Sequence, residues 1–419
     1  RSLVGENSTG KSSFLAAARA AGDLLWVPEV DFNRPPFDLG AFDNIASRSR
    51  GRFGKADRFH IGFGKQMSSQ GPGEGLFEES EESVACVEAT YASRDGQPQL
   101  SQLRLAYAGC TCEAKRARDG SVALSFVTPG GACTVKAPAQ MGSFLNTSIR
   151  NLELLRSDEC DVEPEQRTIV QAALGHLRAA SRELDRAGYR SVTPIAPVRA
   201  KPKRTYDPKS DALEPEGDHV PMVLARLVAN DPATWEKLRE QLERFGMQSG
   251  LFKDIAIRRF GSKGSGPFQV RVKISGTEMN LLDVGYGVSQ VLPVITDALL
   301  APRSRTFLLQ QPEVHLHPKA QAQLGTLFGS LCKTKKHRFL IETHSDYLLD
   351  RVCLDVRDGT AGLRPDDVVI LYFERKKGPW VTIHTIFIDE NGNIQGAPEG
   401  YRDFFLNEQA RHFQVQPCV

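Results

Sequence analysis

The stretch Gly5-Glu6-Asn7-Ser8-Thr9-Gly10-Lys11-Ser12 decides the fold class of this chain. It has the spacing of a P-loop, in which glycines let the backbone turn tightly and present its N–H groups to a phosphate. Apolar Leu3-Val4 precedes it as the end of a strand, and a helix-forming segment from about Lys11 to Ala20 follows it. Because a helix N-terminus favours anions, the sequence predicts a site for the phosphates of a nucleoside triphosphate.

Individual side chains of this loop have predictable roles. Lys11 supplies a positive charge for the β- and γ-phosphate oxygens, and the hydroxyl of Ser12 can ligate Mg²⁺. A P-loop needs a full strand and a surrounding sheet, and the sequence begins at Arg1, so we expect preceding strands to lie outside it. The expected nucleotide-binding residues in this segment are Gly5, Glu6, Asn7, Ser8, Thr9, Gly10, Lys11, Ser12 and Ser13.

The composition is that of an ordinary soluble protein with room for a large core. The 419 residues are 40% hydrophobic and 25% charged, and the net charge of +2 argues neither for nor against a nucleic-acid partner. No run of 18 or more apolar residues predicts a membrane span. The eight cysteines contain no C-x-x-C pair, which indicates reduced thiols and a cytoplasmic location.

The pattern along the chain predicts an α/β fold with a mixed central sheet, an antiparallel β subdomain and a helical insertion. Short alternating runs separated by turns such as Arg94-Asp95-Gly96 predict an antiparallel meander. Residues 193–208 contain too many prolines for either regular element. Strands and helices alternate after residue 280, which favours a parallel sheet. The expected segments are the N-terminal part of the P-loop lobe at 1–54, the β subdomain at 55–145, the insertion at 146–250 and the C-terminal part of that lobe at 251–419.

A second motif follows the apolar run Thr306-Phe307-Leu308-Leu309, at the place of a Walker B segment. Polar side chains at the carboxyl end of such a strand hold the Mg²⁺ shell and orient the attacking water. Gln310 is expected at the metal and Gln311 at the water, although glutamine is a very poor base. Glu313 is the nearest carboxylate, and it is either the catalytic base or a carboxylate that stabilises a helix N-terminus.

Three further features accompany these motifs. His344 follows an apolar strand and can donate to a γ-phosphate, or it is satisfied by loop carbonyls. The signature-like segment (residues 285–290) runs from a Gly-rich turn into an apolar helix, where Gly287 and Ser289 can bind a phosphate. His315 and His317 form an H-x-H pair without an evident third ligand, so a structural or inter-subunit role is favoured over a metal site.

The order of these motifs resembles that of ABC-type ATPases of the SMC and OLD-like group. The likeness is greatest to stand-alone prokaryotic ATPases with Pro-Glu-x-His-Leu-His-Pro in Walker B, many of them in antiphage defence systems. It spans most of the chain, including Ala196 to Tyr206 and the segment that begins at Ile388. The pair Gln310-Gln311 departs from the Asp-Glu pattern of the group, and Gln311 is either native or a substitution that traps nucleotide.

This resemblance implies a P-loop NTPase of ABC-type head architecture that uses ATP and Mg²⁺. Lys11 and Ser12 then belong to Walker A, and Gln310, Gln311 and Glu313 to Walker B. His344 is the switch histidine. Residues 285–290 of one subunit complete the nucleotide site of the other, so ATP closes a homodimer or higher oligomer. The expected partner is an effector protein such as a nuclease.

Three functions compete at this point. An ATPase switch controls an effector through dimer closure. An OLD-like nuclease or nucleic-acid-binding ATPase is the second alternative, although only about 75 residues follow His344, which is short for another catalytic domain. A nucleotide-gated scaffold that does not hydrolyse ATP is the third, and the glutamines favour it. Nucleic acid stays possible because Arg199, Lys201, Lys203 and Arg204 form a basic cluster beside Tyr206.

Overall fold

A computed structural model gives the fold of the chain and describes residues 1–6, 8–24, 30–46, 56–66, 84–116, 121–136, 163–186, 192–208, 212–260, 266–376, 380–403, 407 and 411. Asn7 of the P-loop, the Gly/Ser/Glu-rich segment 67–82 and the loop 261–265 lie outside the described residues. The chain divides into two compact units, which are Arg1–Ser12 with Thr193–Val419 (unit 1), and Ser13–Val192 (unit 2).

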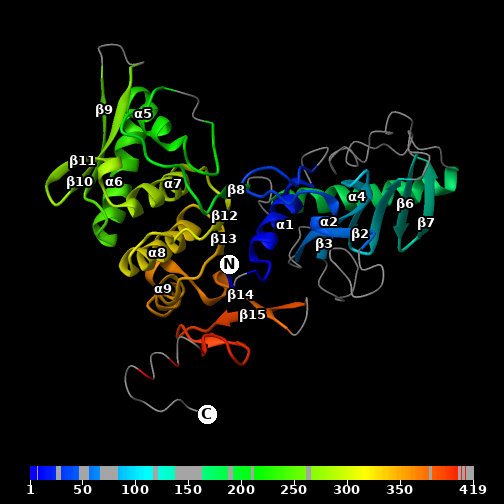
Figure 1. The fold of residues 1–419 in the computed structure, drawn as a ribbon. Coiled ribbons are helices and arrows are strands. Elements are labelled where there is room, and N and C mark those ends of the chain that lie inside the picture. The colour runs from blue at the N-terminus through cyan, green and yellow to red at the C-terminus, as the bar shows by residue number, and fades with distance from the viewer. Residues whose placement is uncertain are drawn as a thin grey trace. The chain divides into compact units, whose positions relative to one another are not determined.

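Unit 1 is built on a seven-stranded mixed sheet with the order β16-β15-β14-β1-β13-β12-β8 (Figure 1). The P-loop strand β1 pairs in parallel with β13 and β14, and β12 pairs in parallel with β13. Every residue of β12 is buried, as expected for a strand covered on both faces. The strands are β1 (Ser2–Gly5), β8 (Val192–Ile195), β12 (Thr306–Gln310), β13 (Arg338–Glu342), β14 (Ile370–Arg375), β15 (Val381–Ile388) and β16 (Ile394–Gln395).

The strand order separates the two predicted motifs by one strand. β13 lies between β1, which leads into the P-loop, and β12, which leads into the Walker B segment. Helix α1 (Lys11–Asp23) follows β1, α8 (Pro318–Thr334) follows β12, and α9 (Asp346–Arg357) follows β13. Because parallel strands end at the same edge of a sheet, the segments after β1, β12 and β13 meet there.

Residues 193–208 were expected to hold no regular element, and this was wrong for the first of them, which belong to a strand. Strand β8 contains Pro194 and forms the edge of the sheet beside β12. A proline cannot donate a ladder hydrogen bond, but an edge strand has one side without a neighbour where that donor is not needed.

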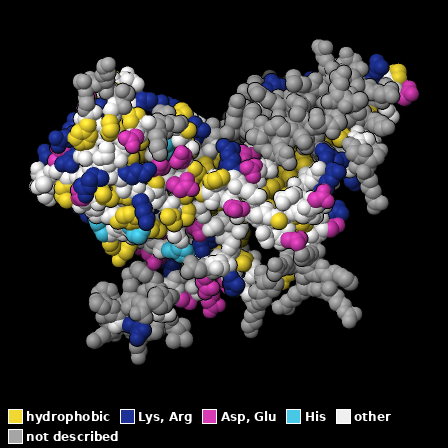
Figure 2. All heavy atoms as spheres, turned by 45° about the horizontal axis from the view of Figure 1, so that its top comes forward, with side chains coloured by type: hydrophobic (Ala, Val, Ile, Leu, Met, Phe, Trp, Pro, Cys, Tyr) yellow, Lys and Arg dark blue, Asp and Glu magenta, His cyan; other side chains and the backbone are white. Residues whose placement is uncertain are grey.

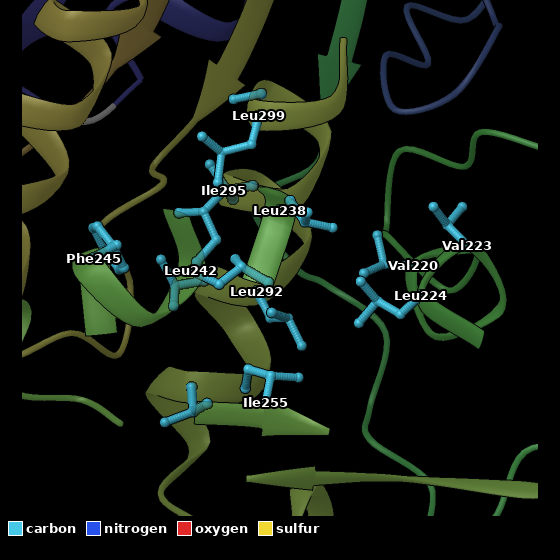
Figure 3. Close-up of a cluster of buried hydrophobic side chains, with 14 of the residues drawn as sticks. Val220, Val223, Leu224, Leu238, Leu242, Phe245, Ile255, Leu292, Ile295 and Leu299 are labelled. Atoms are coloured by element: carbon cyan, nitrogen blue, oxygen red, sulfur yellow. The ribbon is translucent and has the colours of Figure 1, made fainter. Parts of the chain in front are cut away.

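The main core of unit 1 packs helices α5, α6 and α7, together with residues of α8 and α9, against the sheet. Val220 and Leu224 of α5, Leu242 of α6, Leu292 of α7 and their neighbours form one buried cluster (Figure 3). A small antiparallel sheet with the order β11-β10-β9 contributes Ile255 to this cluster. The elements are α5 (Val220–Asn230), α6 (Pro232–Ser249), β9 (Asp254–Arg259), β10 (Phe268–Ile274), β11 (Thr277–Asn280), η3 (Leu281–Asp283) and α7 (Tyr286–Leu300).

Unit 2 contains the predicted antiparallel meander, which the structure confirms. Its six strands pair in chain order, and the turn at Asp95-Gly96 has the positive φ values of 52° and 78° that a tight hairpin requires. The alternation of apolar and polar residues in the sequence did not reveal two of these strands, β5 and β7. The elements are α2 (Phe42–Ile45), β2 (Arg58–Gln66), β3 (Val84–Arg94), β4 (Gln97–Tyr107), β5 (Cys110–Arg116), β6 (Val122–Thr128), β7 (Gly131–Lys136) and α4 (Pro164–Arg186).

The helices expected as one insertion at 146–250 lie in different units. The apolar face of α4, including Ala173 and Leu177, packs in one cluster with the six-stranded sheet of unit 2. The amphipathic pattern of α5 and α6 instead faces the core of unit 1. Spacing along a helix reveals its apolar face but not the sheet against which that face packs.

The carboxyl-terminal strands form two hairpins. β14 pairs with β15 and β15 with β16, both antiparallel, and Gly392 has a φ of 76° in the second turn. The Asp389 carboxylate accepts hydrogen bonds from the N–H groups of Asn391 and Asn393, which makes this segment a side-chain-stabilised turn. The short 3₁₀ segments η4 (Thr360–Gly362) and η5 (Pro365–Asp367) precede β14. No helix within the described ranges has the length and apolar character needed to cross a membrane.

Candidate functional site

The P-loop backbone needs glycine at its first position for a specific steric reason. Gly5 has a φ of 137°, and a Cβ atom there would lie 2.3 Å from the carbonyl oxygen of Phe373 on the neighbouring strand β14. Gly10, with a φ of 87°, closes the loop before α1 begins at Lys11. Arg375 at the end of β14 donates a hydrogen bond to the carbonyl of Ser8 and thereby ties the loop to the sheet.

The loop folds around the ammonium group of Lys11. Its Nζ donates to the carbonyl oxygens of Gly5 (3.1 Å) and Glu6 (2.6 Å), and Thr9 Oγ1 also donates to Glu6 (2.8 Å). Lys11 is only 3% exposed. Burial lowers the pKa of its ammonium group, and the nearby Glu342 carboxylate acts in the opposite direction. A buried cation whose hydrogen bonds within the described residues go to neutral carbonyls is poised to meet an anion.

Ser12 contacts a residue that the sequence had not singled out. Its hydroxyl donates to Glu342 Oε2 at 2.7 Å. Glu342 is the last residue of β13 and is buried. The signal that would have found it is its place at the carboxyl end of the apolar run Arg338–Glu342. Ser13, expected among the nucleotide contacts, lies exposed in the first turn of α1.

The Walker B strand ends beside Glu342. Gln310 is the last residue of β12 and is aligned with Glu342 across the parallel pair. It is buried, and its Oε1 has no hydrogen-bond partner within the part of the chain that the structure describes. Gln311 has a φ of 43°, and its N–H donates to the Glu342 carbonyl at 2.8 Å. This left-handed residue turns the chain sharply out of the strand.

The carboxylate of Glu313 holds the segment that follows β13. Its Oε1 accepts hydrogen bonds from Thr343 Oγ1 and from the His344 N–H, both at 2.8 Å. The side chain is buried, and it does not occupy a helix start, since α8 begins only at Pro318. The imidazole of His344 is exposed, while Ser345 caps α9 by accepting from the Leu348 N–H.

Arg199 contacts the same Walker B turn from residues 193–208. It is 2% exposed, and its Nη2 lies 3.2 Å from the carbonyl of Gln311 and 3.5 Å from that of Gln310. Burial lowers the pKa of its guanidinium to about 10, and the charge of Glu313 partly compensates. The sequence placed Arg199 in a basic cluster, but the structure makes it a buried support of the turn.

Two other cations of that cluster, Lys203 and Arg204, also have partners within the protein. Lys203 pairs with Asp218 at 3.2 Å, and Arg204 makes a bidentate pair with Asp283. Tyr206 is buried and stacks on Phe268 with ring centroids 5.6 Å apart. On the face drawn in Figure 2, Lys and Arg side chains are interspersed with acidic and apolar ones. Because Asp218 and Asp283 lie beside Lys203 and Arg204, the cluster is not a uniformly basic surface.

The signature-like segment packs against the Walker B turn. A Cβ atom at Gly287 would lie 2.6 Å from the carbonyl oxygen of His315, and the rings of Tyr286 and His315 meet edge to face at 4.9 Å. The Ser289 hydroxyl is buried and donates to the Tyr286 carbonyl at 2.8 Å. Tyr286 itself is 41% exposed at the start of α7. Searched over the described residues, His315 and His317 belong to no cluster of three or more metal-ligating side chains.

Comparison with known proteins gives one family match. Residues 178–350 match the family model described as "AAA domain, putative AbiEii toxin, Type IV TA system". The matched region contains Arg199, the signature-like segment, β12, β13 and the start of α9. This part of the chain is therefore similar to an AAA-type ATPase domain. No curated protein matches the chain.

Among solved structures, the chain is similar to SMC head domains. An SMC head bound to the C-terminal winged-helix domain of ScpA aligns at 12% identity and a TM-score of 0.42, over 93% of this chain and 90% of that one. An SMC head with an extended coiled coil, bound to ScpA from Pyrococcus furiosus, aligns at 9% identity and 0.38, over 98% and 92%. The SMC head of Thermotoga maritima aligns at 11% identity and 0.34, over 91% and 88%.

Proposed function

We propose that this protein is a slow ATPase whose nucleotide-dependent dimerisation controls a partner effector, in antiphage defence. The observation that carries the proposal is the buried Lys11 ammonium in its cage of loop carbonyls, next to Ser12 and the ends of β12 and β13. The description of the matching family model supports a link to toxin systems. Nothing in this proposal requires nucleic acid.

Each proposed role follows from the position of the side chain. Lys11 exchanges its contacts with the Gly5 and Glu6 carbonyls for contacts with the β- and γ-phosphate oxygens. Ser12 and Gln310 carry the hard oxygen atoms that Mg²⁺ prefers, and the ion would neutralise charge on the phosphates. His344 is exposed at the end of β13 and can donate to a γ-phosphate.

Slow turnover follows from the groups available to activate water. The amide of Gln311 can orient a water molecule but cannot take its proton. Glu313 can take a proton at its Oε2, which has no hydrogen-bond partner among the described residues, while its Oε1 accepts from Thr343 and from the His344 N–H. We assign Glu313 as the base and Gln311 as the water-positioning residue. The same observations favour a nucleotide-gated scaffold as the second candidate, which steady-state phosphate release would rule out.

A substitution at Lys11 tests the site assignment. Lys11→Ala removes the buried cation, so we expect ATP binding measured with a fluorescent ATP analogue to weaken by at least about 100-fold. Lys65→Ala is the matched control, because Lys65 is a half-buried lysine paired with Glu183 in unit 2. Nucleotide affinity that is unchanged in Lys11→Ala would refute the site.

A further inference from the structure

Three oxygen-bearing side chains converge where β12, β13 and α1 meet. Leu3 of β1 aligns with Glu342 of β13, and Glu342 aligns with Gln310 of β12. Aligned residues of parallel strands project from the same face of a sheet. Ser12 in the first turn of α1 reaches this face, because its hydroxyl lies 2.7 Å from Glu342 Oε2.

Two of these side chains are buried, and one of their oxygen atoms lacks a hydrogen-bond partner among the described residues. Glu342 is 6% and Gln310 8% exposed, so both are more than nine-tenths buried. Gln310 Oε1 has no hydrogen-bond partner among the described residues, although a buried acceptor normally has one. An unpartnered amide oxygen beside a carboxylate repels other acceptors and attracts a donor or a cation.

The chemistry of the cluster selects a small hard cation. Mg²⁺ in P-loop proteins is held by the Ser or Thr hydroxyl that follows the P-loop lysine and by an acid at the end of the Walker B strand. In this chain the end of that strand is Gln310, which has no charge. A neutral amide alone compensates the ion poorly, so a carboxylate from elsewhere is needed.

We propose that Glu342 supplies this carboxylate, so that the acidic ligand of the Mg²⁺ site comes from β13 in place of β12. The inference rests on the proposed nucleotide site. The Ser12 hydroxyl can donate its proton to Glu342 and still offer a lone pair to the ion, so the observed hydrogen bond is compatible with coordination. Gln310 contributes its unpartnered Oε1 to the same shell.

The test measures the metal itself, with Mn²⁺ as the spectroscopic substitute for Mg²⁺. Binding of Mn²⁺ to the ADP complex is followed by electron paramagnetic resonance, and ADP affinity is measured separately in EDTA. We expect Glu342→Gln to weaken Mn²⁺ binding by about 10- to 100-fold while ADP affinity in EDTA stays within about twofold. The matched control Glu374→Gln removes a carboxylate of β14 that pairs with His384, and it should leave Mn²⁺ affinity unchanged.

A charge swap makes the result independent of any loss of stability. The double variant Glu342→Gln with Gln310→Glu moves the carboxylate to the aligned position on β12, and we expect it to recover most of the lost Mn²⁺ affinity. Wild-type Mn²⁺ affinity in Glu342→Gln would overturn the inference, and so would a swap that recovers nothing. Failure of the wild-type chain to bind ADP in EDTA would refute the nucleotide site itself, which is a different outcome.

Discussion

At the scale of single residues, the guanidinium of Arg199 supports the turn on which the candidate chemistry depends. It donates to the carbonyls of Gln310 and Gln311, where the positive φ of Gln311 redirects the chain out of β12. Its positive charge also lies near the buried carboxylate of Glu313. Removing one partner of such a buried arrangement leaves the other uncompensated.

We therefore expect Arg199→Met to lower the free energy of unfolding by about 3 kcal/mol, measured by urea denaturation. Neutralising the orphaned carboxylate in Arg199→Met with Glu313→Gln should recover part of the loss, because the two side chains interact. Arg204→Met is the control, since its ion pair with Asp283 is exposed to solvent and should contribute little to stability. Equal losses for Arg199→Met and Arg204→Met would contradict the supporting role.

At the scale of elements, β13 organises the site. It lies between the P-loop strand and the Walker B strand, and its end provides Glu342, Thr343 and His344. The buried His337 just before β13 accepts from the Arg305 N–H at 3.2 Å and packs against the rings of Phe307 and Phe339. Burial is the main reason that the pKa of His337 is lowered to about 4, and the positive charges of Lys335 and Arg305 act in the same direction.

This shift gives stability a pH dependence of known sign. Between about pH 6.5 and 4 the unfolded chain binds a proton at His337 that the folded chain does not. The free energy of unfolding is therefore undiminished above pH 6.5 and decreases as the pH is lowered from 6.5 to about 4. We expect a contribution of about 3 kcal/mol at most over this window. His337→Asn, which can still accept from Arg305, should flatten thermal stability against pH, whereas exposed His176→Asn should not. Identical slopes in all three proteins would exclude His337 as the cause.

At the scale of the whole molecule, the exposed start of α7 is the surface through which we propose that a second copy completes the nucleotide site. Tyr286 is 41% exposed there, whereas Gly287 is packed against His315 and Ser289 is buried. A substitution at Tyr286 therefore tests the dimer with less disturbance of the fold than one at Gly287 or Ser289.

Wild-type protein should become dimeric by analytical ultracentrifugation when ATP and Mg²⁺ are added. Tyr286→Glu places a negative charge where the partner's phosphates arrive, so we expect it to stay monomeric with unchanged ATP affinity at low protein concentration. Met247→Glu, at an exposed position of α6, is the control for the added charge and should dimerise normally. ATP-dependent dimerisation of Tyr286→Glu would show that α7 is not the contact.

The sequence by itself determined the features that depend on local spacing. These are the P-loop with its flanking strand and helix, and the meander of unit 2, because each depends on residues that are close in the chain. Only the tertiary structure decided that β13 lies between the two motif strands. The tertiary structure also brought Glu342 to Ser12. It buried Arg199, which the sequence had placed in a basic cluster, and it made Pro194 part of an edge strand. Strand order and the pairing of buried charges depend on packing between segments hundreds of residues apart, which no local pattern records.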